Sequence, residues 1–312
     1  MVTVSEETAV DYELTAKIAT EAFALAEVQF SAERIKWLYE RAFGRGTTVL
    51  AAIDDGRKVG QIAMIGQSIC VAGEIHPAVQ LVDLFLLQAY RSTHVVRKLY
   101  KEVENYCAKQ NIRYMLALPN DKSAPLNARF LKLSPVLWMP IRAGVSLWQP
   151  ASDAIAHSGL LKPMTRDQAI DLLAPFTGPA DENGSHWESK TLFDRLDDPT
   201  RDYALHTTQN LLLVSTRRKT KGVSFTALCA FFVRPSTKPS EDEVDELVRA
   251  ACRLWKLPVF VYAGANSRLP KLPGTPLPTR LRRPILVQLR DTRIDANNIH
   301  FDRFQLIDSD FA

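Results

Sequence analysis

Residues 81–133 read LVDLFLLQAYRSTHVVRKLYKEVENYCAKQNIRYMLALPNDKSAPLNARFLKL, and this stretch decides the fold. The apolar run over 81–87 predicts a β-strand, and the polar turn QAYRSTH leads into an amphipathic helix over about 95–109. A strand over 113–118 and a second short helix follow. A strand that opens directly onto a helix N-terminus presents unpaired backbone N–H groups, which suit a pyrophosphate or another anion.

The composition is that of an ordinary globular protein. Of the 312 residues, 46% are hydrophobic and 24% charged, and the net charge of +4 argues against a molecule that binds polyanions over its whole surface. The start MVTVSEETAVDYE has no signal-peptide pattern and no apolar run is long enough to span a membrane, so we expect a soluble, cytoplasmic protein. The four cysteines show no CxxC pairing, which favours free buried thiols over disulfide or metal use.

The first half of the chain combines predicted helices with a predicted hairpin. Helices are expected over 11–27 and 31–43, the second with Ser31 as its N-cap. The stretch TTVLAAIDDGRKVGQIAMIGQSICV predicts two strands joined by a tight turn, in which Gly56 supplies the positive φ. We expect a short loop with His76–Pro77 before the strand at 81, and one or two edge strands in VLWMPIRAGVSLW.

The second half repeats this order of elements. After a polar, Ala-rich linker at 149–158, helices are predicted over 166–174 and in HWESKTLFDRLDD, and strands over 202–208 and 210–216. The basic turn RRKTKG, the strand VSFTALCAFFV, a helix over 241–255 and the strands VFVYAG and ILVQL follow. The helices at 95–109 and 241–255 each precede a strand that runs into an Asn-containing loop. This order indicates a duplicated domain, with two unrelated α+β halves as the alternative.

At this point the chain resembles the GCN5-related N-acetyltransferase (GNAT) superfamily. That family has a strand with an acidic residue, then Pro-x-Tyr-Arg-Gly-x-Gly-x-Gly, then a helix. In VDLFLLQAYRSTHVVRKL, Asp83 falls on the acidic position and Tyr90–Arg91 on the Tyr-Arg pair. The three glycine positions hold Ser92, His94 and Val96.

The stretch PNDKSAPLNARFLKLSPV resembles a second family pattern, Asn-x-x-Ser followed by Leu-Tyr-x-Lys-Leu-Gly-Phe. Asn120 and Ser123 match, and Phe130 takes the tyrosine position. The likeness covers roughly residues 10–148, and the second half looks like a diverged copy. It implies an α+β fold of two tandem GNAT-like domains, each a mixed, mostly antiparallel twisted sheet flanked by helices. The implied division is a coenzyme-binding domain over 1–148, the linker over 149–158 and a diverged domain over 159–312.

The resemblance implies an acyl-CoA-dependent N-acyltransferase. Its cosubstrate would be acetyl-CoA or another acyl-CoA, its acceptor the primary amine of a small molecule such as an amino sugar or amino acid, and no metal or nucleic acid is expected. The implied coenzyme contacts are Leu86, Leu87, Arg91, Ser92, Thr93, His94, Val95, Val96, Arg97, Asn120, Ser123 and Phe130. Glycines let backbone amides approach a phosphate closely, whereas bulkier side chains crowd it, so Ser92–Thr93 could instead simply cap a helix with a solvated basic first turn.

Asp83 is the first choice for the base that takes the amine proton, because a carboxylate in an apolar strand is costly unless it is paired or functional. The alternative is a carboxylate paired with a nearby arginine. Glu74 and His76 either face the acceptor or are ordinary loop residues. Phe130 cannot protonate the leaving thiolate, so that role would pass to Tyr90, His94 or water.

Two other functions compete with the enzyme. A catalytically inactive GNAT-like scaffold that binds a ligand or protein partner is favoured by the missing glycines and tyrosine. A nucleic-acid surface would use the basic runs RRKTKG and TRLRRP, but aromatic residues are not interleaved with these charges as single-strand binding requires.

Overall fold

The computed structural model describes residues 1–23, 30–147, 153–178, 182–294 and 298–310. Its chain forms two compact units, each assembled from more than one stretch of sequence. Unit 1 consists of Met1–Ile69, His76–Val136 and Leu286–Asn298, and unit 2 of Cys70–Ile75, Leu137–Ile285 and Ile299–Ala312. None of the helices in the described residues combines the length and the apolar character needed to cross a membrane.

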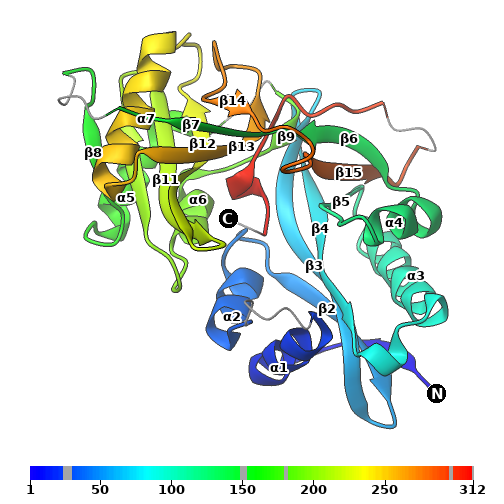
Figure 1. Cartoon of the computed structure of the whole chain (residues 1–312). Coiled ribbons are helices and arrows are strands. Elements are labelled where there is room, and N and C mark those ends of the chain that lie inside the picture. Colours follow the sequence, from blue (N-terminus) through cyan, green and yellow to red (C-terminus); the bar gives the residue numbers. More distant parts are fainter. Residues whose placement is uncertain (24–29, 148–152, 179–181, 295–297, 311–312) are drawn as a thin grey trace. The chain divides into compact units, whose positions relative to one another are not determined.

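Unit 1 is built on a mixed sheet (Figure 1). Along the sheet the strands are β1 (Thr3–Glu6), β2 (Thr47–Asp54), β3 (Arg57–Val71), β4 (Glu74–Leu86), β5 (Tyr114–Ala117), β15 (Ile285–Asp291) and β6 (Ser134–Met139). β4 and β5 run parallel, whereas the pairs β1–β2, β2–β3 and β5–β15 are antiparallel. The strand β15, from near the C-terminus, therefore completes a sheet whose other strands come from the first half of the chain.

The hairpin between β2 and β3 follows from its turn residues. Asp55 and Gly56 both have positive φ, +48° and +75°, as a two-residue turn matching the strand twist requires. Further along β3, Gly60 allows β4 to approach closely, because a Cβ there would lie 2.4 Å from the carbonyl oxygen of Phe85.

Helices cover the sheet of unit 1. They are α1 (Tyr12–Phe23), α2 (Ala32–Glu40), α3 (Thr93–Lys109) and α4 (Ser123–Leu131). Ser31 caps α2 by accepting from the N–H of Arg34, as predicted. α3 buries Val95, Leu99 and Val103 in the main core of the unit. Burial of an aliphatic side chain is worth about 1.5–3 kcal/mol, so this face fixes α3, and with it the orientation of its N-terminus.

Unit 2 repeats the design. Its sheet contains β7 (Ile141–Val145), β8 (His157–Leu160), β10 (Tyr203–Thr207), β11 (Leu211–Thr220), β12 (Val223–Val233), β13 (Val259–Asn266) and β14 (Thr275–Pro276). β12 and β13 run parallel, like β4 and β5, and β7 from the first half of the chain pairs with β13. The short strands β9 (Gly184–Ser185) and β16 (Arg303–Gln305) pair with each other, and β16 also pairs with β13. The helices of this unit are α5 (Arg166–Leu173), α6 (Ser189–Leu196) and α7 (Glu241–Trp255).

The fold class predicted from the sequence is confirmed, and α7 spans the predicted residues. The predicted helix over 11–27 is observed up to Phe23, and residues 24–27 lie outside the described residues. Residues 148–152, most of which belong to the predicted linker, also lie outside the described residues. The last residues of that linker belong to β8. The division at 148 and 159 stays a prediction, since each compact unit draws on both halves of the chain.

Three local predictions were wrong. β4 begins at Glu74 rather than at 81, so the predicted loop with His76–Pro77 is part of the strand. Pro77 is tolerated there because it lies just before Ala78, the first residue that pairs with β5, and its missing N–H removes no hydrogen bond from that pairing. The predicted basic turn RRKTKG is mostly strand, and only Lys221–Gly222 turn, both with positive φ. α6 starts at Ser189, because Glu188 forms a capping box there and so ends the preceding extended segment.

Candidate functional site

The two parallel strands of unit 1, β4 and β5, separate toward their carboxyl ends. The last pair between β4 and β5 is Leu81 with Ala117, and no further pairing joins them in the described residues. Two residues later Asp83 takes the left-handed conformation, with φ at +50°, which is uncommon for a residue with a side chain. Beyond Leu81 the backbone of β4 therefore has no neighbouring strand on the side of β5 among the described residues. Among the described residues, no side chain forms a hydrogen bond with the main chain of Val82–Phe85.

Helix α3 begins just beyond this opening. The hydroxyl of Ser92 accepts the N–H of Val95, at 3.3 Å, and so caps the helix. The N–H groups of Thr93 and His94 have no acceptor in the described part of the chain. Both side chains are exposed, whereas Val95 is buried in the core and points away from the turn. The turn therefore offers two backbone donors to an anion without glycine, and Val95 does not plug it.

The charges around this helix start are positive. The first turn of α3 carries no acidic residue, and the exposed side chain of Arg97 makes no ion pair within the described residues. Lys98 donates to the carbonyl of Val2 at 2.7 Å, and Arg91 donates to the carbonyls of Leu86 and Ala22. Arg91 thus ties the turn to α1 and β4, while its charge adds to that of the helix dipole.

Asp83 lies at the centre of a small hydrogen-bond relay. The hydroxyl of Tyr39 on α2 donates to its carboxylate at 2.6 Å, and the side-chain amide of Gln61 on β3 donates to that hydroxyl at 2.8 Å. Burial raises the pKa of Asp83, while the bond from Tyr39 and the charge of Arg34 act in the opposite direction. The same burial, together with the charge of Asp83, raises the pKa of Tyr39 well above its ordinary value. The arrangement holds a half-buried carboxylate in one rotamer with a raised proton affinity, as a general base requires.

Solved structures of similar fold were found, although no protein-family model and no curated protein matches the sequence. A conserved protein of Enterococcus faecalis superposes with a TM-score of 0.66 at 12% identity, over 93% of this chain and 73% of that one. A GCN5-related N-acetyltransferase of Anabaena variabilis gives 0.60, at the same identity and the same shares of both chains. The N-myristoyltransferase of Saccharomyces cerevisiae, solved with bound myristoyl-CoA, gives 0.59 at 12% identity over 93% of this chain and 82% of its own.

The chain has the GNAT fold. In unit 1 the opening between β4 and β5 lies beside the start of α3. Along this opening lie several residues predicted to contact the coenzyme: Arg91, Ser92, Thr93, His94 and Arg97. Val95, Leu86 and Leu87 belong instead to the buried core behind it, and Val96 is half-buried. These three buried side chains shape the GNAT core and do not face the turn.

The remaining predicted coenzyme contacts lie at α4. Asn120 accepts the N–H groups of Lys122 and Ser123 with its side-chain oxygen, so it forms the entry to this helix. The hydroxyl of Ser123 bonds back to Asn120. Phe130 packs against Tyr100, with ring centres 6.3 Å apart. Asn120 and Ser123 thus shape the loop after β5, whatever contact they make with a ligand.

The structure does not bring the three predicted catalytic residues together. Tyr90 donates its hydroxyl to Asp54 at 3.2 Å, at the tip of the β2–β3 hairpin, and this bond is the main cause that raises its pKa. Glu74 is exposed at the first residue of β4, at the other end of that strand from Asp83. Two residues later, His76 lies beside Tyr114, with the rings tilted by 54° and their centres 5.3 Å apart. Asp83 is the predicted catalytic residue that lies at the opening.

Sequence reasoning missed Tyr39 and Gln61. Gln61 is fully buried within an apolar strand, and a buried amide of this kind is a signal that the sequence does carry. Tyr39 on α2 gives no such signal, because a tyrosine at helical spacing also fits an ordinary core position. Its partner lies 44 residues away in the sequence, and only the fold places the two together.

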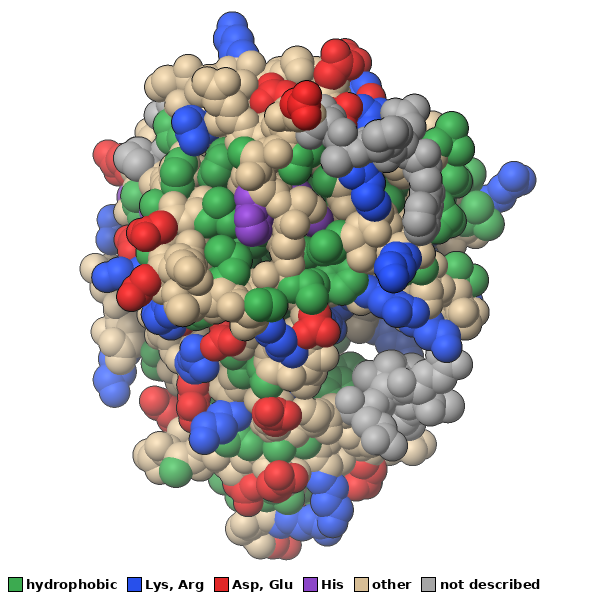
Figure 2. Space-filling view, turned by 90° about the vertical axis from the view of Figure 1, so that its left-hand side faces the viewer, with side chains coloured by type: hydrophobic (Ala, Val, Ile, Leu, Met, Phe, Trp, Pro, Cys, Tyr) green, Lys and Arg blue, Asp and Glu red, His purple; other side chains and the backbone are tan. Residues whose placement is uncertain are grey.

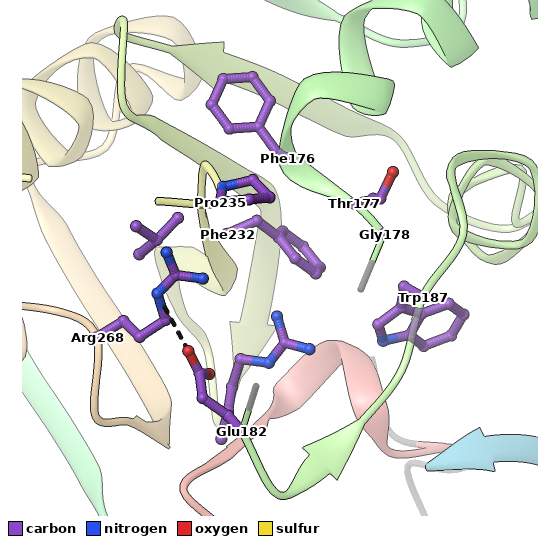
Figure 3. Close-up of a pocket in the computed structure, with 10 residues that line it drawn as sticks. Phe176, Thr177, Gly178, Glu182, Trp187, Phe232, Pro235 and Arg268 are labelled. Atoms are coloured by element: carbon purple, nitrogen blue, oxygen red, sulfur yellow. Dashed lines mark ion pairs between the residues drawn. The ribbon is translucent and has the colours of Figure 1, made fainter. Parts of the chain in front are cut away.

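In unit 2 the gap between the corresponding parallel strands is filled. β12 and β13 separate beyond Leu228 and Tyr262, but β16 pairs with the end of β13 and its Gln305 fills the gap. The side-chain amide of Gln305 accepts the N–H of Phe231 at 2.8 Å and donates to the carbonyl of Phe231 at 3.0 Å. A small pocket at the end of β12, lined by Phe232 and Val233 among others, has about 20 Å³ of free volume, room for about one water (Figure 3). Figure 3 also shows Arg268 and Glu182 in this pocket, paired at 3.1 Å.

The helix start of unit 2 also differs. Ser240 and Glu243 form a capping box at α7, which pairs the N–H groups of these two residues, and Glu241 and Asp242 add negative charge to the first turn. These acidic side chains repel an anion at the start of α7, whereas the first turn of α3 carries no acidic residue.

Proposed function

We propose that the protein is an acyl-CoA-dependent N-acyltransferase whose coenzyme site lies in unit 1. The observation that carries the proposal is the pair of unaccepted N–H groups of Thr93 and His94 beside an opening between parallel strands. A pyrophosphate at a helix N-terminus is a common use of such donors. The bound myristoyl-CoA of the yeast N-myristoyltransferase, a protein of similar fold, supports the choice of ligand. We place the enzyme in the cytoplasm, where its four buried cysteines would remain free thiols.

Each residue of the opening then has a task. Thr93 and His94 donate to the pyrophosphate through their main chain, and Arg97 supplies a mobile positive charge beside it. Beyond Leu81, the edge of β4 that no longer pairs with β5 lies alongside the pantetheine arm, with Asp83 at its left-handed residue. The coenzyme supplies the thioester whose acyl group is transferred.

Asp83 acts on the acceptor. The amine nitrogen forms a bond to the thioester carbonyl carbon, the carbon–sulfur bond breaks, and the amine loses a proton. The Asp83 carboxylate takes that proton, directly or through a water, while Tyr39 and Gln61 hold it in place. The leaving thiolate is protonated from water, because Tyr90 is bonded to Asp54 at the hairpin tip. The acceptor is the primary amine of a small molecule, with amino sugars and amino acids as the first to test.

A nucleic-acid substrate has less support. The net charge is only +4, and on the left and lower parts of the face in Figure 2 acidic side chains lie among the basic ones, although several basic side chains lie together at its right. Nucleic-acid binding needs a basic stripe or patch along the contact surface.

The test deletes one of the two backbone donors. Proline is favoured at the first residue of a helix, so Thr93→Pro removes the N–H and leaves α3 able to form. The preceding Ser92 already has the extended conformation that a following proline requires. A hydrogen bond to a charged group is worth about 1.5–3 kcal/mol, so we expect coenzyme A to bind roughly ten- to a hundredfold more weakly in isothermal titration.

The matched control is Glu241→Pro, the same position at the start of α7 in unit 2. It should leave the affinity for coenzyme A unchanged. Equal affinity of Thr93→Pro and the parent protein would remove the proposed site, and so would weaker binding by the α7 variant. Coenzyme binding without turnover on any amine in a thioester assay would instead favour an inactive scaffold.

A further inference from the structure

Unit 2 contains a pocket of about 730 Å³, a size typical of small-molecule sites. Its walls come from the segment before β8, from α5, from the turn between β10 and β11, from the end of β12 and from the start of α7. Apolar contact is available from Leu172 and Pro175 of the α5 side. The proposed acyl transfer assigns no role to this pocket.

One cation in the pocket has no partner. The guanidinium of Arg234 stacks over the ring of Phe176, 5.4 Å from its centre, and both residues line the pocket. Within the part of the chain that the structure describes, no oxygen accepts from this guanidinium and its Nε is buried. Its main chain is held firmly, because the Arg234 carbonyl accepts from Arg268 at 2.9 Å. A fixed, stacked guanidinium without a counter-ion is well suited to bind a carboxylate.

Carboxylates also line the pocket. Asp153 and Asp171 are exposed on its wall and form no ion pair among the described residues. Glu243 is different, because Thr208 donates to it at 2.7 Å and Asn210 at 3.2 Å. These bonds, with that from Ser240, lower the pKa of Glu243 and keep it ionised. The pocket therefore combines one unpaired positive group with a larger negative charge.

This combination selects a class of ligand. A phosphate or a dicarboxylate would satisfy Arg234 but would be repelled by the three carboxylates. A simple amine would leave the guanidinium unpaired. We propose that this pocket binds a small zwitterion, an amino acid or a short peptide with free ends, whose carboxylate pairs with Arg234 and whose ammonium group lies toward Asp171. The side chain of the ligand lies along Leu172 and Pro175.

The experiment measures binding alone, so its result is independent of acyl transfer. The twenty standard amino acids and their glycyl dipeptides are screened at 10 mM by thermal shift. The best binder is then compared by isothermal titration with its carboxamide and with its N-acetyl derivative, each of which lacks one charge. We expect both derivatives to bind at least tenfold more weakly.

Variants locate the site. Arg234→Gln should weaken the best binder by tenfold or more, and Asp171→Asn, on an exposed face of α5, by several-fold. Arg217→Gln on the exposed part of β11, which is not among the pocket residues, is the charge-matched control and should bind normally. All three variants should bind coenzyme A as the parent does, which separates this pocket from the site in unit 1. Thermal unfolding of each variant shows whether it is folded.

Three results would overturn the proposal. They are the absence of any stabilising amino acid or dipeptide, equal binding of the N-acetyl derivative, and unchanged affinity in a folded Arg234→Gln protein. If Arg234→Gln does not fold, Asp171→Asn decides, because unchanged affinity there removes the ammonium site.

Discussion

The bond between Tyr39 and Asp83 gives the sharpest test of the proposed chemistry. Tyr39→Phe removes one hydroxyl from a buried position and leaves the ring in place. The carboxylate of Asp83 then loses a hydrogen bond of 2.6 Å, while the backbone at Asp83 is untouched. Because this bond stabilises the ionised form, its loss should raise the pKa of Asp83 further above the ordinary value.

The size of the shift follows from the kind of bond. A hydrogen bond to a charged group contributes about 1.5–3 kcal/mol, and one pKa unit corresponds to about 1.4 kcal/mol. The pKa of Asp83 should therefore rise by about one to two units. A base works only when it is ionised, so activity is lost as the pH falls through its pKa. The acid limb of the profile should move to higher pH by the same one to two units.

The assay is kcat/KM against pH for the transfer of an acetyl group to a small amine, followed by release of free thiol. The control is Tyr12→Phe on the neighbouring helix α1, whose hydroxyl donates to Glu40 and whose ring meets that of Tyr39 edge-on at 6.4 Å. This variant loses a similar hydroxyl beside the site and should keep the parent acid limb. Asp83→Asn completes the series, because asparagine tolerates the left-handed conformation but cannot accept the proton.

An acid limb that stays in place in a folded Tyr39→Phe protein would refute the reasoning. Full activity of Asp83→Asn would refute it more directly. A shift in Tyr12→Phe equal to that in Tyr39→Phe would show that the effect is a general loosening of the helices and not the loss of one bond.

Three further predictions concern stability. Burial lowers the pKa of His206 from 6.5 to about 3, so the unfolded state takes up a proton before the folded state does as the pH falls. The free energy of unfolding, measured by denaturant titration, should therefore drop by about 2 kcal/mol between pH 7 and pH 5. His206→Gln should abolish that part of the loss. Lys58→Met leaves Glu7 without its 2.7 Å partner and should destabilise the protein by about 3 kcal/mol, with partial recovery when Glu7→Gln is added. Gln305→Ala leaves the main-chain N–H of Phe231 buried without its acceptor and should cost about 3 kcal/mol by urea unfolding, without any gain in coenzyme A affinity.

Elements with strong local signals could be predicted from the sequence. α7 has a capping box at Ser240 and Glu243 and an apolar stripe at Val244, Leu247 and Ala251, and it was located to the residue. The hairpin at Asp55–Gly56 was likewise readable, because two residues with positive φ are a local requirement. The cap of α3 at Ser92 also follows from local pattern, whereas the left-handed conformation of Asp83 in the strand before it was not predicted.

Features that depend on distant partners could not be predicted. β15 and β7 are short apolar strands with no mark of which sheet they join, and each pairs with strands far away in the sequence. β16 has only three residues, too few for a periodic signal, yet its Gln305 fills the gap between β12 and β13 by bonding to Phe231. The relay of Tyr39 to Asp83 is of the same kind, because its two ends meet only after the helix has packed on the sheet.

The two units differ in how they satisfy the main-chain groups where their parallel strands separate. A parallel pair that splits leaves main-chain groups that must find partners, since a buried unsatisfied group costs about 1–3 kcal/mol. In unit 2 the chain supplies partners itself where the strands separate, through Gln305 at Phe231, and acidic side chains occupy the first turn of α7. In unit 1 the helix start at Thr93 is exposed to water, so its donors cost nothing when no ligand is bound. A helix start of that kind is stable when empty and can accept an anion, and for this reason we propose the coenzyme site in unit 1.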